Sequence, residues 1–472
     1  MTSGSQADSR PVAATGSAAA MQTAPQAAGQ PGMATSAAAP AVQPWPRGIL
    51  IFIHSLHGGG AERVAADLSA QWAQAGVPVT LVTLAGAGDD AYALHPAVRR
   101  VALDMAGDSG GGIKGLWANL RRVRALRACI RASGAELVLG MMTTASVLAV
   151  LASRGLALRV IATEHTHPPS QSLSGLWLRL RRLTYPKADR VVALTRDTAR
   201  WIETHVPGSR LAVIPNPVHW PLQHEPPIVA PPPARPPDVG SPAASPAVAS
   251  PAAGSPAAGS PAVGSPAAGS PTAGSPAAGS RILLAVGRLH RDKGFDLLLQ
   301  AYASIAARFP DWHLVILGEG SERAALTAQI AELGLDPHVS LPGRVGNMDD
   351  WYARADLYVL SSRVEGLSNT LLEAMSSGLA AVAFDCETGP REIVRDGQDG
   401  LLVRPAADPR ALAEALAGVM GDDARRQALA ASAAQVRERF SVERVLGLWR
   451  DVFTRDTAHA PRAADTASST DS

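Results

Sequence analysis

Cysteine, aromatic side chains and long apolar runs are all scarce in this chain of 472 residues. Its two cysteines, Cys129 and Cys386, exclude a disulfide scaffold and every metal site that needs several thiolates. No run of about 18 apolar residues occurs, so the sequence predicts no membrane-spanning helix. Residues 1–47 also lack a basic start followed by an apolar stretch, which argues against a secretory signal there.

Net charge is small as well, at +2 from 43 basic and 41 acidic side chains. This balance, with only 4% aromatic residues, argues against a nucleic-acid partner. The total conceals an asymmetry, because residues 48–220 hold 19 basic and 11 acidic side chains, a net +8. Residues 281–456 hold 20 and 25, a net −5. Only the first block is therefore expected to be drawn to an anionic partner.

Low-complexity segments separate these blocks. Residues 1–47 and 457–472 are polar and show no periodicity, which predicts disordered tails. Residues 221–280 are rich in proline and, from Gly240, repeat a five-residue unit such as Gly254-Ser-Pro-Ala-Ala. Proline in every unit excludes a packed helix or strand, and the unit is too short for a solenoid. A flexible linker is predicted, with a partner-binding motif as the alternative.

Each block alternates short apolar runs with longer segments of helical periodicity. The predicted strands are Gly48–His54, Val77–Leu84, Glu136–Gly140, Leu158–Thr163, Arg190–Leu194 and Leu211–Ile214, then Arg281–Val286, Trp312–Leu317, Val339–Leu341, Asp356–Leu360, Ala380–Phe384 and Leu401–Val403. Apolar strands that alternate with helices predict an α/β fold: two Rossmann-like, doubly wound domains with parallel sheets, 48–220 and 281–456, facing each other across a cleft. Ligands of such sheets bind at the carboxyl ends of the strands.

The loop after the first predicted strand is rich in glycine. Residues 55–62 hold three consecutive glycines, which let the backbone approach a ligand next to the N-terminus of a helix predicted over 61–75. This loop has neither dinucleotide-fingerprint spacing nor the Gly-Lys-Ser/Thr of a P-loop. A tight turn between strand and helix is the alternative.

Two loops of the second block carry charged side chains. Arg288 and Lys293 lie between a strand and a helix, and two cations there suit a diphosphate, although basic loop residues are often merely solvated. Glu365 follows the strand 356–360, and Glu373 lies about one turn into a helix that Ser368 or Asn369 would cap. The first amides of that helix would bind an anion. A capping acid and a surface glutamate are the alternative.

In number and order, these motifs resemble glycosyltransferase family 4, whose members are retaining enzymes with the GT-B fold. The matching segments are His54–Val64, Thr163–Thr166, Ile214–Val218, Val286–Gly294, the pair Glu365 and Glu373 with seven residues between them, and Asp385–Glu392. The last of these is close to a variant found in bacterial hexosyltransferases of surface polysaccharide and glycan assembly. The five-residue repeat is not a feature of the family.

The resemblance implies a role for each matching residue. The catalytic set would be Arg288, Lys293, Glu365 and His165, and the donor would be bound by Gly59, Gly60, Asn216, Gly287, Gly366, Leu367, Ser368, Asn369 and Glu373. Arg288 and Lys293 would hold the donor diphosphate, and Glu373 the ribose. For His165, a histidine of the core is the alternative.

The resemblance also implies a substrate class. We expect a hexose or N-acetylhexosamine carried by a nucleotide diphosphate, UDP most of all, and a glycan acceptor linked to lipid. No cofactor is implied, and no metal is expected because the chain has no D-x-D segment. An epimerase or hydrolase of the same fold, or a relative that only binds, is the alternative. The paired glutamates Glu365 and Glu373 argue against the first alternative, and together with Arg288 and Lys293 they argue against the second.

A basic amphipathic helix is predicted over residues 114–131. Its apolar positions are 116, 120, 123, 126 and 130, with Trp117 beside them, and Arg121, Arg124, Arg127 and Arg131 cover the adjoining arc. The segment Trp177–Leu183 is similar. Such helices suit an anionic membrane surface, which predicts a cytoplasmic protein held peripherally on the inner face of the cell membrane. A solvated helix face is the alternative.

Overall fold

The computed structural model describes residues 45–88, 90–107, 113–222, 224, 226–233 and 279–454. All of them belong to one compact unit, Pro44–Ser472. Nearly all of the predicted N-terminal tail, the whole of the C-terminal one, and residues 234–278 with the five-residue repeat lie outside the described residues.

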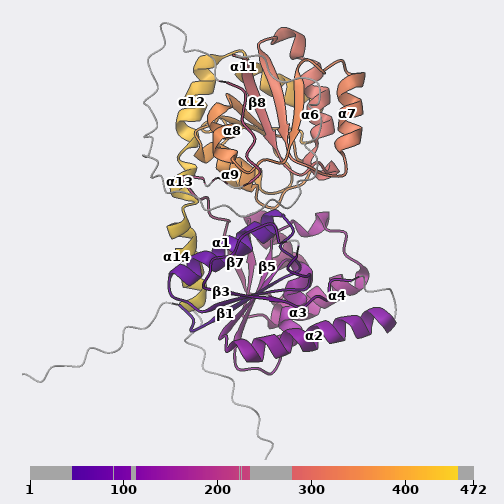
Figure 1. The fold of residues 1–472 in the computed structure, drawn as a ribbon, viewed down its shortest axis with the longest axis vertical. Coiled ribbons are helices and arrows are strands. Elements are labelled where there is room, and N and C mark those ends of the chain that lie inside the picture. The colour runs from indigo at the N-terminus through magenta and orange to yellow at the C-terminus, as the bar shows by residue number, and fades with distance from the viewer. Residues whose placement is uncertain are drawn as a thin grey trace, which may run out of the picture. The chain divides into compact units, whose positions relative to one another are not determined.

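The first domain is built on a parallel sheet of seven strands in the order β3-β2-β1-β4-β5-β6-β7 (Figure 1). The strands are β1 (Ile49–Ile53), β2 (Val79–Thr83), β3 (Val98–Ala102), β4 (Leu137–Met141), β5 (Arg159–Glu164), β6 (Arg190–Ala193) and β7 (Leu211–Val213). β1, β2 and β4 are buried throughout, as expected for strands that are covered on both faces. Sequence analysis missed β3, an edge strand in which two arginines interrupt the apolar pattern.

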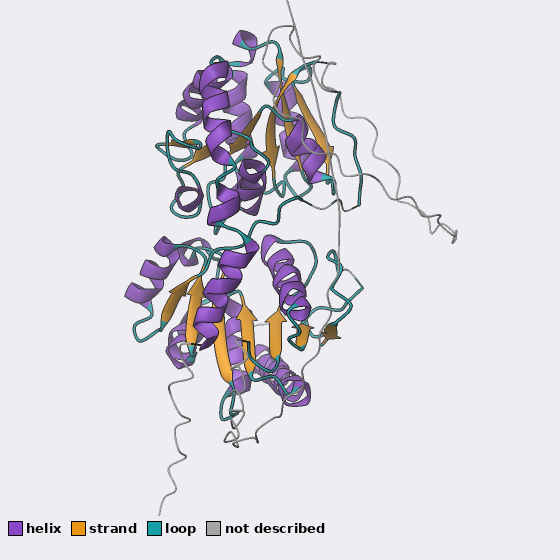
Figure 2. Ribbon diagram, turned by 90° about the vertical axis from the view of Figure 1, so that its left-hand side faces the viewer, coloured by secondary structure: helices purple, strands orange, loops and turns teal. Residues whose placement is uncertain are grey.

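Helices cover both faces of this sheet, as Figure 2 shows. They are α1 (Gly60–Gln74), α2 (Ile113–Ser133), α3 (Thr143–Ser153), α4 (Gly175–Thr184) and α5 (Arg196–His205), with the short 3-10 turns η1 (Pro168–Ser170) and η2 (Tyr185–Lys187). α1 packs on the face that carries Ile49, Ile51 and Ile53. Residues of α2, α3, α4 and α5 pack on the opposite face, with Leu50 and Phe52.

The second domain has a parallel sheet of six strands in the order β10-β9-β8-β11-β12-β13. The strands are β8 (Arg281–Val286), β9 (Trp312–Leu317), β10 (Val339–Gly343), β11 (Leu357–Leu360), β12 (Ala381–Phe384) and β13 (Leu401–Val403). The helices are α6 (Phe295–Ala303), α7 (Arg323–Glu332), α8 (Met348–Arg354), α9 (Asn369–Ser376), α10 (Pro390–Ile393), α11 (Pro409–Met420), α12 (Asp423–Ala433) and α13 (Val436–Arg439), with the turns η3 (Arg291–Lys293) and η4 (Ala306–Arg308). The predicted fold class, two doubly wound α/β domains, is confirmed.

Both sheets reverse their strand order at the centre, between β1 and β4 and between β8 and β11. Ligands of doubly wound sheets bind outside the strand ends at such a switch point. The glycine loop follows β1, the loop of Arg288 and Lys293 follows β8, and the loop of Glu365 follows β11. The topology therefore brings all three predicted loops to the two switch points.

The last helix, α14 (Val442–Thr454), packs against the first sheet although it follows the second domain in the chain. Its Trp449 lies 5.7 Å from Trp72 of α1, ring centre to ring centre and edge to face. A bridge between Val218 and Ser441 joins the two segments that pass between the domains. The boundary taken from the sequence, which ends the second domain at residue 456, thus includes a helix that covers the first.

Part of the segment assigned to the linker is fixed to the second domain. Asn347 and Trp351 of the α8 region both donate hydrogen bonds to the carbonyl of Val229, at 3.0 and 2.9 Å. Arg354 donates to the carbonyl of Pro232 at 2.9 Å and to that of Ser280 at 2.5 Å. One guanidinium therefore holds the chain on both sides of residues 234–278, so that these residues leave and rejoin the domain at one place.

Among the described residues, no helix combines the length and the apolar character needed to cross a bilayer.

Candidate active site

The loops after β8 and β11 bring a cation and a carboxylate into direct contact. Lys293 Nζ lies 2.6 Å from Glu365 Oε1, and Ser362 Oγ donates to the same oxygen at 2.6 Å. Glu365 is almost fully buried, with 7% of its surface exposed. Gly294 makes this approach possible. Its φ is +63°, and a Cβ at this position would lie only 2.1 Å from the carbonyl oxygen of Ser361, so any other residue would collide there. The two predicted catalytic residues are thus brought together.

Arg288 lies on the loop after β8, as Lys293 does, and its side chain is exposed. In the part of the chain that the structure describes, no carboxylate is paired with this guanidinium. Lys293, in contrast, already has an anionic partner. The loop therefore presents one unengaged cation and one that is held in place, while Gly287 packs against the methylenes of Lys293.

The helix α9 begins as the sequence predicts. Ser368 is the N-cap, and its hydroxyl accepts a hydrogen bond from the amide of Leu371 at 3.4 Å. Asn369 is the first helical residue, and its side-chain oxygen accepts a hydrogen bond from Asn216 of the first domain at 2.8 Å. Two predicted donor-binding residues from opposite domains, Asn216 and Asn369, are therefore in contact.

Glu373 is held from both domains. Its Oε1 lies 2.7 Å from Nη1 of Arg63, which belongs to α1, and its Oε2 accepts a hydrogen bond from the hydroxyl of Tyr352 at 3.1 Å. Only 6% of Glu373 is exposed. Burial and the neighbouring Glu373 raise the pKa of Tyr352, which keeps this phenol protonated as a donor. Sequence analysis named neither Arg63 nor Tyr352.

The glycine loop lies next to α9. Gly59 is the N-cap of α1, with an extended backbone, and its carbonyl accepts a hydrogen bond from Tyr92 at 3.2 Å. A Cβ on Gly60 would lie 3.6 Å from the amide nitrogen of Asn369. A Cβ on Gly366 would lie only 2.0 Å from the carbonyl oxygen of His165. Glycine at 366 therefore lets the two domains meet backbone to backbone.

His165 has one ring nitrogen engaged and one free. Nε2 lies 2.9 Å from the hydroxyl of Thr163, whereas Nδ1 is buried and has no hydrogen-bond partner among the described residues. Burial lowers the pKa of His165 to about 4, so the imidazole is neutral at pH 7. A neutral ring with an unused nitrogen is suited to a polar contact with a ligand, not to holding a charge.

Glu164, next to His165, is a buried carboxylate that the sequence did not single out for chemistry. It accepts hydrogen bonds from Thr143 at 2.8 Å, from Gln171 at 3.1 Å and from Tyr185 at 2.5 Å. Burial raises its pKa, and these hydrogen bonds work in the opposite direction. The network fixes the end of β5, from which His165 projects.

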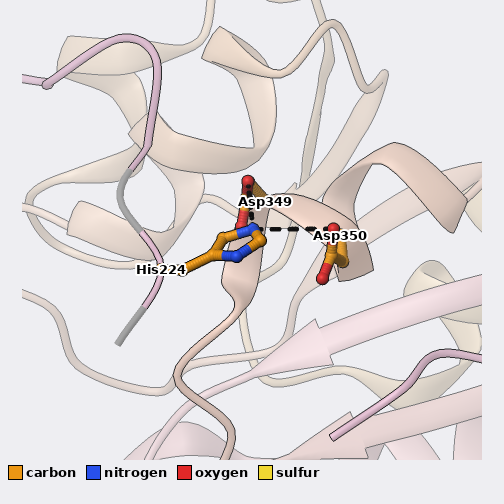
Figure 3. A group of neighbouring side chains, drawn as sticks. All are labelled: His224, Asp349 and Asp350. Atoms are coloured by element: carbon orange, nitrogen blue, oxygen red, sulfur yellow. Dashed lines mark hydrogen bonds and ion pairs between the residues drawn. The ribbon is translucent and has the colours of Figure 1, made fainter. Parts of the chain in front are cut away.

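A group of His224, Asp349 and Asp350 lies on the surface of the second domain (Figure 3). His224 Nε2 is 2.7 Å from Asp349 Oδ2, the separation of a direct hydrogen bond, and 3.6 Å from Asp350. The hydrogen bond between His224 and Asp349 accounts for the closeness of these two side chains. We read this group as an attachment of the segment around His224 to α8.

Taken together, the loops after β8 and β11 offer two cations, two carboxylates and a capped helix start, and the first domain adds glycines and His165. Cations and helix amides favour a polyanion. Carboxylates that keep spare lone pairs accept hydrogen bonds from hydroxyl groups. This combination is suited to a ligand that is a diphosphate at one end and carries hydroxyl groups at the other.

Comparison with known proteins agrees with this chemistry. Residues 58–219 match the family model of Glycosyltransferase Family 4, and residues 280–422 match that of Glycosyl transferases group 1. The chain is 32% identical over 299 residues to the exopolysaccharide phosphotransferase SCO2592 of Streptomyces coelicolor, a match that covers 63% of this chain but only 26% of that protein.

Two further matches extend over most of the chain. One is a Campylobacter jejuni α-1,4-N-acetyl-D-galactosaminyltransferase whose substrate is a glycan on diphospho-undecaprenol; it is 23% identical over 402 residues, 85% of this chain and 96% of the relative. The other is the crystal structure of Anabaena HepE in complex with UDP and glucose, with a TM-score of 0.64, 18% identity, and coverage of 87% of this chain and 100% of that one. The chain belongs to the glycosyltransferases of the GT-B type, with a family 4 domain followed by a group 1 domain.

Proposed function

We propose that this chain is a retaining glycosyltransferase that moves a hexose or N-acetylhexosamine from a UDP-linked donor to a lipid-linked glycan in cell-surface polysaccharide synthesis. The contact of Lys293 with Glu365, beside the unengaged Arg288, carries this proposal. It sets cationic and hydroxyl-binding groups side by side at one switch point. Support also comes from the UDP and glucose bound by HepE and from the lipid-linked substrate in the Campylobacter enzyme's name.

The leaving nucleotide is the centre of the proposed chemistry. When the bond between the anomeric carbon and the diphosphate breaks, its electron pair stays on the phosphate oxygen, and negative charge builds up there. Lys293 and the first amides of α9 oppose that charge from fixed positions, and Arg288 adds a second cation; stabilising this charge is the main electrostatic task. An ammonium has three donors, so Lys293 can bind the diphosphate without releasing Glu365.

The carboxylates would position the donor. Glu373 would accept hydrogen bonds from ribose hydroxyls while Arg63 and Tyr352 hold its orientation, since each carboxylate oxygen has two lone pairs. Glu365 would contact the sugar, and the free Nδ1 of His165 would accept or donate one further hydrogen bond to it. The acceptor hydroxyl then bonds to the anomeric carbon and gives up its proton to a phosphate oxygen of the departing diphosphate, leaving UDP and the extended glycan.

The proposed place of action follows from the acceptor. A lipid-linked glycan that is built from nucleotide sugars lies at the inner face of the cell membrane. We propose that the protein binds to this face as a peripheral membrane protein. We also propose that no metal takes part, because the two cations supply the charge and the chain has no D-x-D segment.

Release of nucleoside diphosphate from a panel of nucleotide sugars, with and without membrane extract, tests the proposal. We expect release from a UDP-sugar that depends on the extract, is unchanged by EDTA and yields a product with the donor's anomeric configuration. Free sugar formed at the same rate without extract would favour a hydrolase, and interconversion of UDP-sugars an epimerase. Donor binding without any turnover would favour a relative that only binds.

A further inference from the structure

We infer that the outward faces of α2 and α4 form one docking surface for an anionic lipid bilayer. This inference rests on the proposed function, since it supplies the contact by which a lipid-linked acceptor is reached. The docking surface comprises the exposed apolar residues Leu116, Trp117, Leu120, Leu176, Leu178 and Leu183 and the exposed arginines Arg121, Arg124, Arg179 and Arg182.

Exposed apolar side chains are concentrated on these two helices. Of the ten large apolar residues that are exposed in the described part of the chain, six belong to the docking surface, with exposures between 36% and 65%. Scattered exposed leucines are ordinary, but a concentration of this kind marks an interaction site. Both helices pack against α3 and cover the same face of the first sheet (Figure 1), so the six lie on one side of that domain.

The exposure is not a result of loose packing. On α2, Leu126 and Ile130 are fully buried in the core beneath, while Leu116 and Leu120, one turn apart, face outward. The single apolar stripe expected from the sequence is thus divided, with its C-terminal half in the core and its N-terminal half in solvent. On α4, Trp177 and Leu180 pack inward in the same way.

The charge around these leucines has one sign. Neither α2 nor α4 contains an aspartate or glutamate. In the residues that the structure describes, no carboxylate pairs with any of the four arginines of the docking surface. Arg124 follows Leu120 by four residues and Arg121 follows Trp117 by four, so cations and apolar groups share one strip of the helix surface. This pattern complements anionic headgroups above an apolar interior.

Arg127, which the sequence grouped with the membrane contacts, does not belong to the docking surface. Its Nη1 donates to the carbonyls of Ala152 and Arg154, each at 2.7 Å, at the end of α3. These carbonyls are left without partners where a helix ends, so Arg127 has a structural task. The expectation for this residue was wrong, because helical spacing alone does not tell which arginine meets a neighbouring helix.

The docking surface is connected to the site by a short, fixed segment. α4 begins at Gly175, and Gln171, just before it, donates hydrogen bonds to Glu164 at 3.1 Å and to the carbonyl of Thr166 at 3.2 Å. These two residues flank His165. A bilayer bound at α4 would therefore lie next to the segment that carries the predicted sugar contact.

A bilayer fits the docking surface better than a nucleic acid does. Nucleic-acid surfaces combine basic side chains with aromatic rings that stack on bases, whereas five of the six apolar residues here are leucines. Leucine gains little from a phosphate backbone but partitions into the headgroup boundary of a membrane.

Flotation of the full chain with vesicles tests the inference. One preparation contains phosphatidylglycerol and phosphatidylcholine, and the other phosphatidylcholine alone. The test variant carries Arg121→Gln, Arg124→Gln, Arg179→Gln and Arg182→Gln. The matched control loses four exposed arginines of the second domain and the segment after it, Arg308→Gln, Arg410→Gln, Arg425→Gln and Arg444→Gln.

We expect wild type to bind only the anionic vesicles and to lose binding as salt is added. The test variant should bind them on the order of 100-fold more weakly, and the control nearly as wild type. UDP binding in the absence of vesicles should be equal in all three. A second variant, Leu116→Ser with Leu183→Ser, should also weaken binding while all arginines remain.

Three results would overturn the inference: wild type that ignores anionic vesicles at low salt, equal losses in the test and control variants, or a preference for RNA over vesicles. Failure of the proposed function gives a different pattern, in which the protein binds vesicles but turns over no nucleotide sugar.

Discussion

The two α/β domains share a strand order but arrange their polar groups differently. In the second domain, Glu365 holds Lys293 at 2.6 Å before any donor arrives, while Arg288 on the loop of Lys293 has no carboxylate partner among the described residues. The first domain adds backbone and one neutral ring to the site, at Gly59, Gly60 and His165, and its Arg63 and Asn216 contact side chains of α9. Four of its arginines that have no carboxylate partner among the described residues, Arg121, Arg124, Arg179 and Arg182, lie on the docking surface.

This difference assigns distinct tasks to the domains. Fixed charges stabilise a developing charge best, because they need no rearrangement during the reaction. Unpaired arginines among exposed leucines are suited to a surface whose structure varies, such as a membrane. We therefore assign donor chemistry to the second domain and approach of the acceptor to the first.

Replacing Lys293 or Glu365 by alanine should reduce UDP release from the donor on the order of 100–1000-fold. Loss of one preorganised contact to developing charge costs about 2.7–4 kcal/mol in known enzymes. Steady-state rates with the purified variants measure the effect. Arg291→Ala is the matched control, since this exposed cation lies on the same loop but has no partner in the predicted site. If Lys293→Ala releases UDP at the wild-type rate, the assignment of donor chemistry to the second domain is contradicted.

Gly366→Ala should lower kcat/KM for the donor by about 5–150-fold. The new Cβ would lie 2.0 Å from the carbonyl oxygen of His165, and overpacking of this kind costs about 1–3 kcal/mol. Gly447→Ala in α14 is the control, because nothing lies within 4 Å of its Cβ position. If Gly366→Ala works as well as wild type, backbone contact between the domains is not needed for transfer.

The buried, neutral imidazole of His165 should make the stability of the folded protein depend on pH. Its pKa is lowered to about 4 in the folded protein, against about 6.5 in an unfolded chain. Between these values only the unfolded state takes up the proton, so the free energy of unfolding falls as the pH drops from about 6.5 towards 4. His165→Gln should therefore lose less Tm between pH 7 and pH 5 than wild type does. Identical slopes for His165→Gln and wild type would contradict the buried, neutral ring.

Removing residues 241–275 should have the smallest effect, leaving the transfer rate within about twofold of wild type. Arg354 holds both Pro232 and Ser280, so the removed residues do not connect the two domains. Changes in loop length also cost only about 0.6 kcal/mol per doubling. If the shortened chain has the Tm of a folded protein but no longer transfers sugar, the five-residue repeat is needed for the reaction.

Much of the fold was accessible from the sequence because its strands are buried on both faces. Runs such as Ile49–Ile53 and Trp312–Leu317 have hardly a polar residue to obscure them. The strand Val98–Ala102 was missed, since an edge strand has one open side and tolerates Arg99 and Arg100. The position of α14 could not be read either, because an amphipathic pattern shows that a helix packs, not against which sheet.

The same contrast, between features set by the local sequence and features set by tertiary packing, applies to the predicted site. Residues close in sequence, such as Glu365, Ser368 and Asn369, could be placed from the strand and the cap that flank them. The pair Arg63–Glu373 joins residues 310 positions apart, and its existence depends on how the two domains meet. The only signal in the sequence was that Arg63 directly follows the glycine loop, on the first turn of α1.

Hydrogen–deuterium exchange of the full chain, with UDP in one sample and phosphatidylglycerol vesicles in another, tests the division of tasks most directly. We predict that UDP protects residues 287–294 and 366–376 but not α2 or α4, and that the vesicles protect residues 114–124 and 175–183 but not the UDP segments. Protection of α2 and α4 by UDP, or of residues 287–294 by the vesicles, would contradict the account.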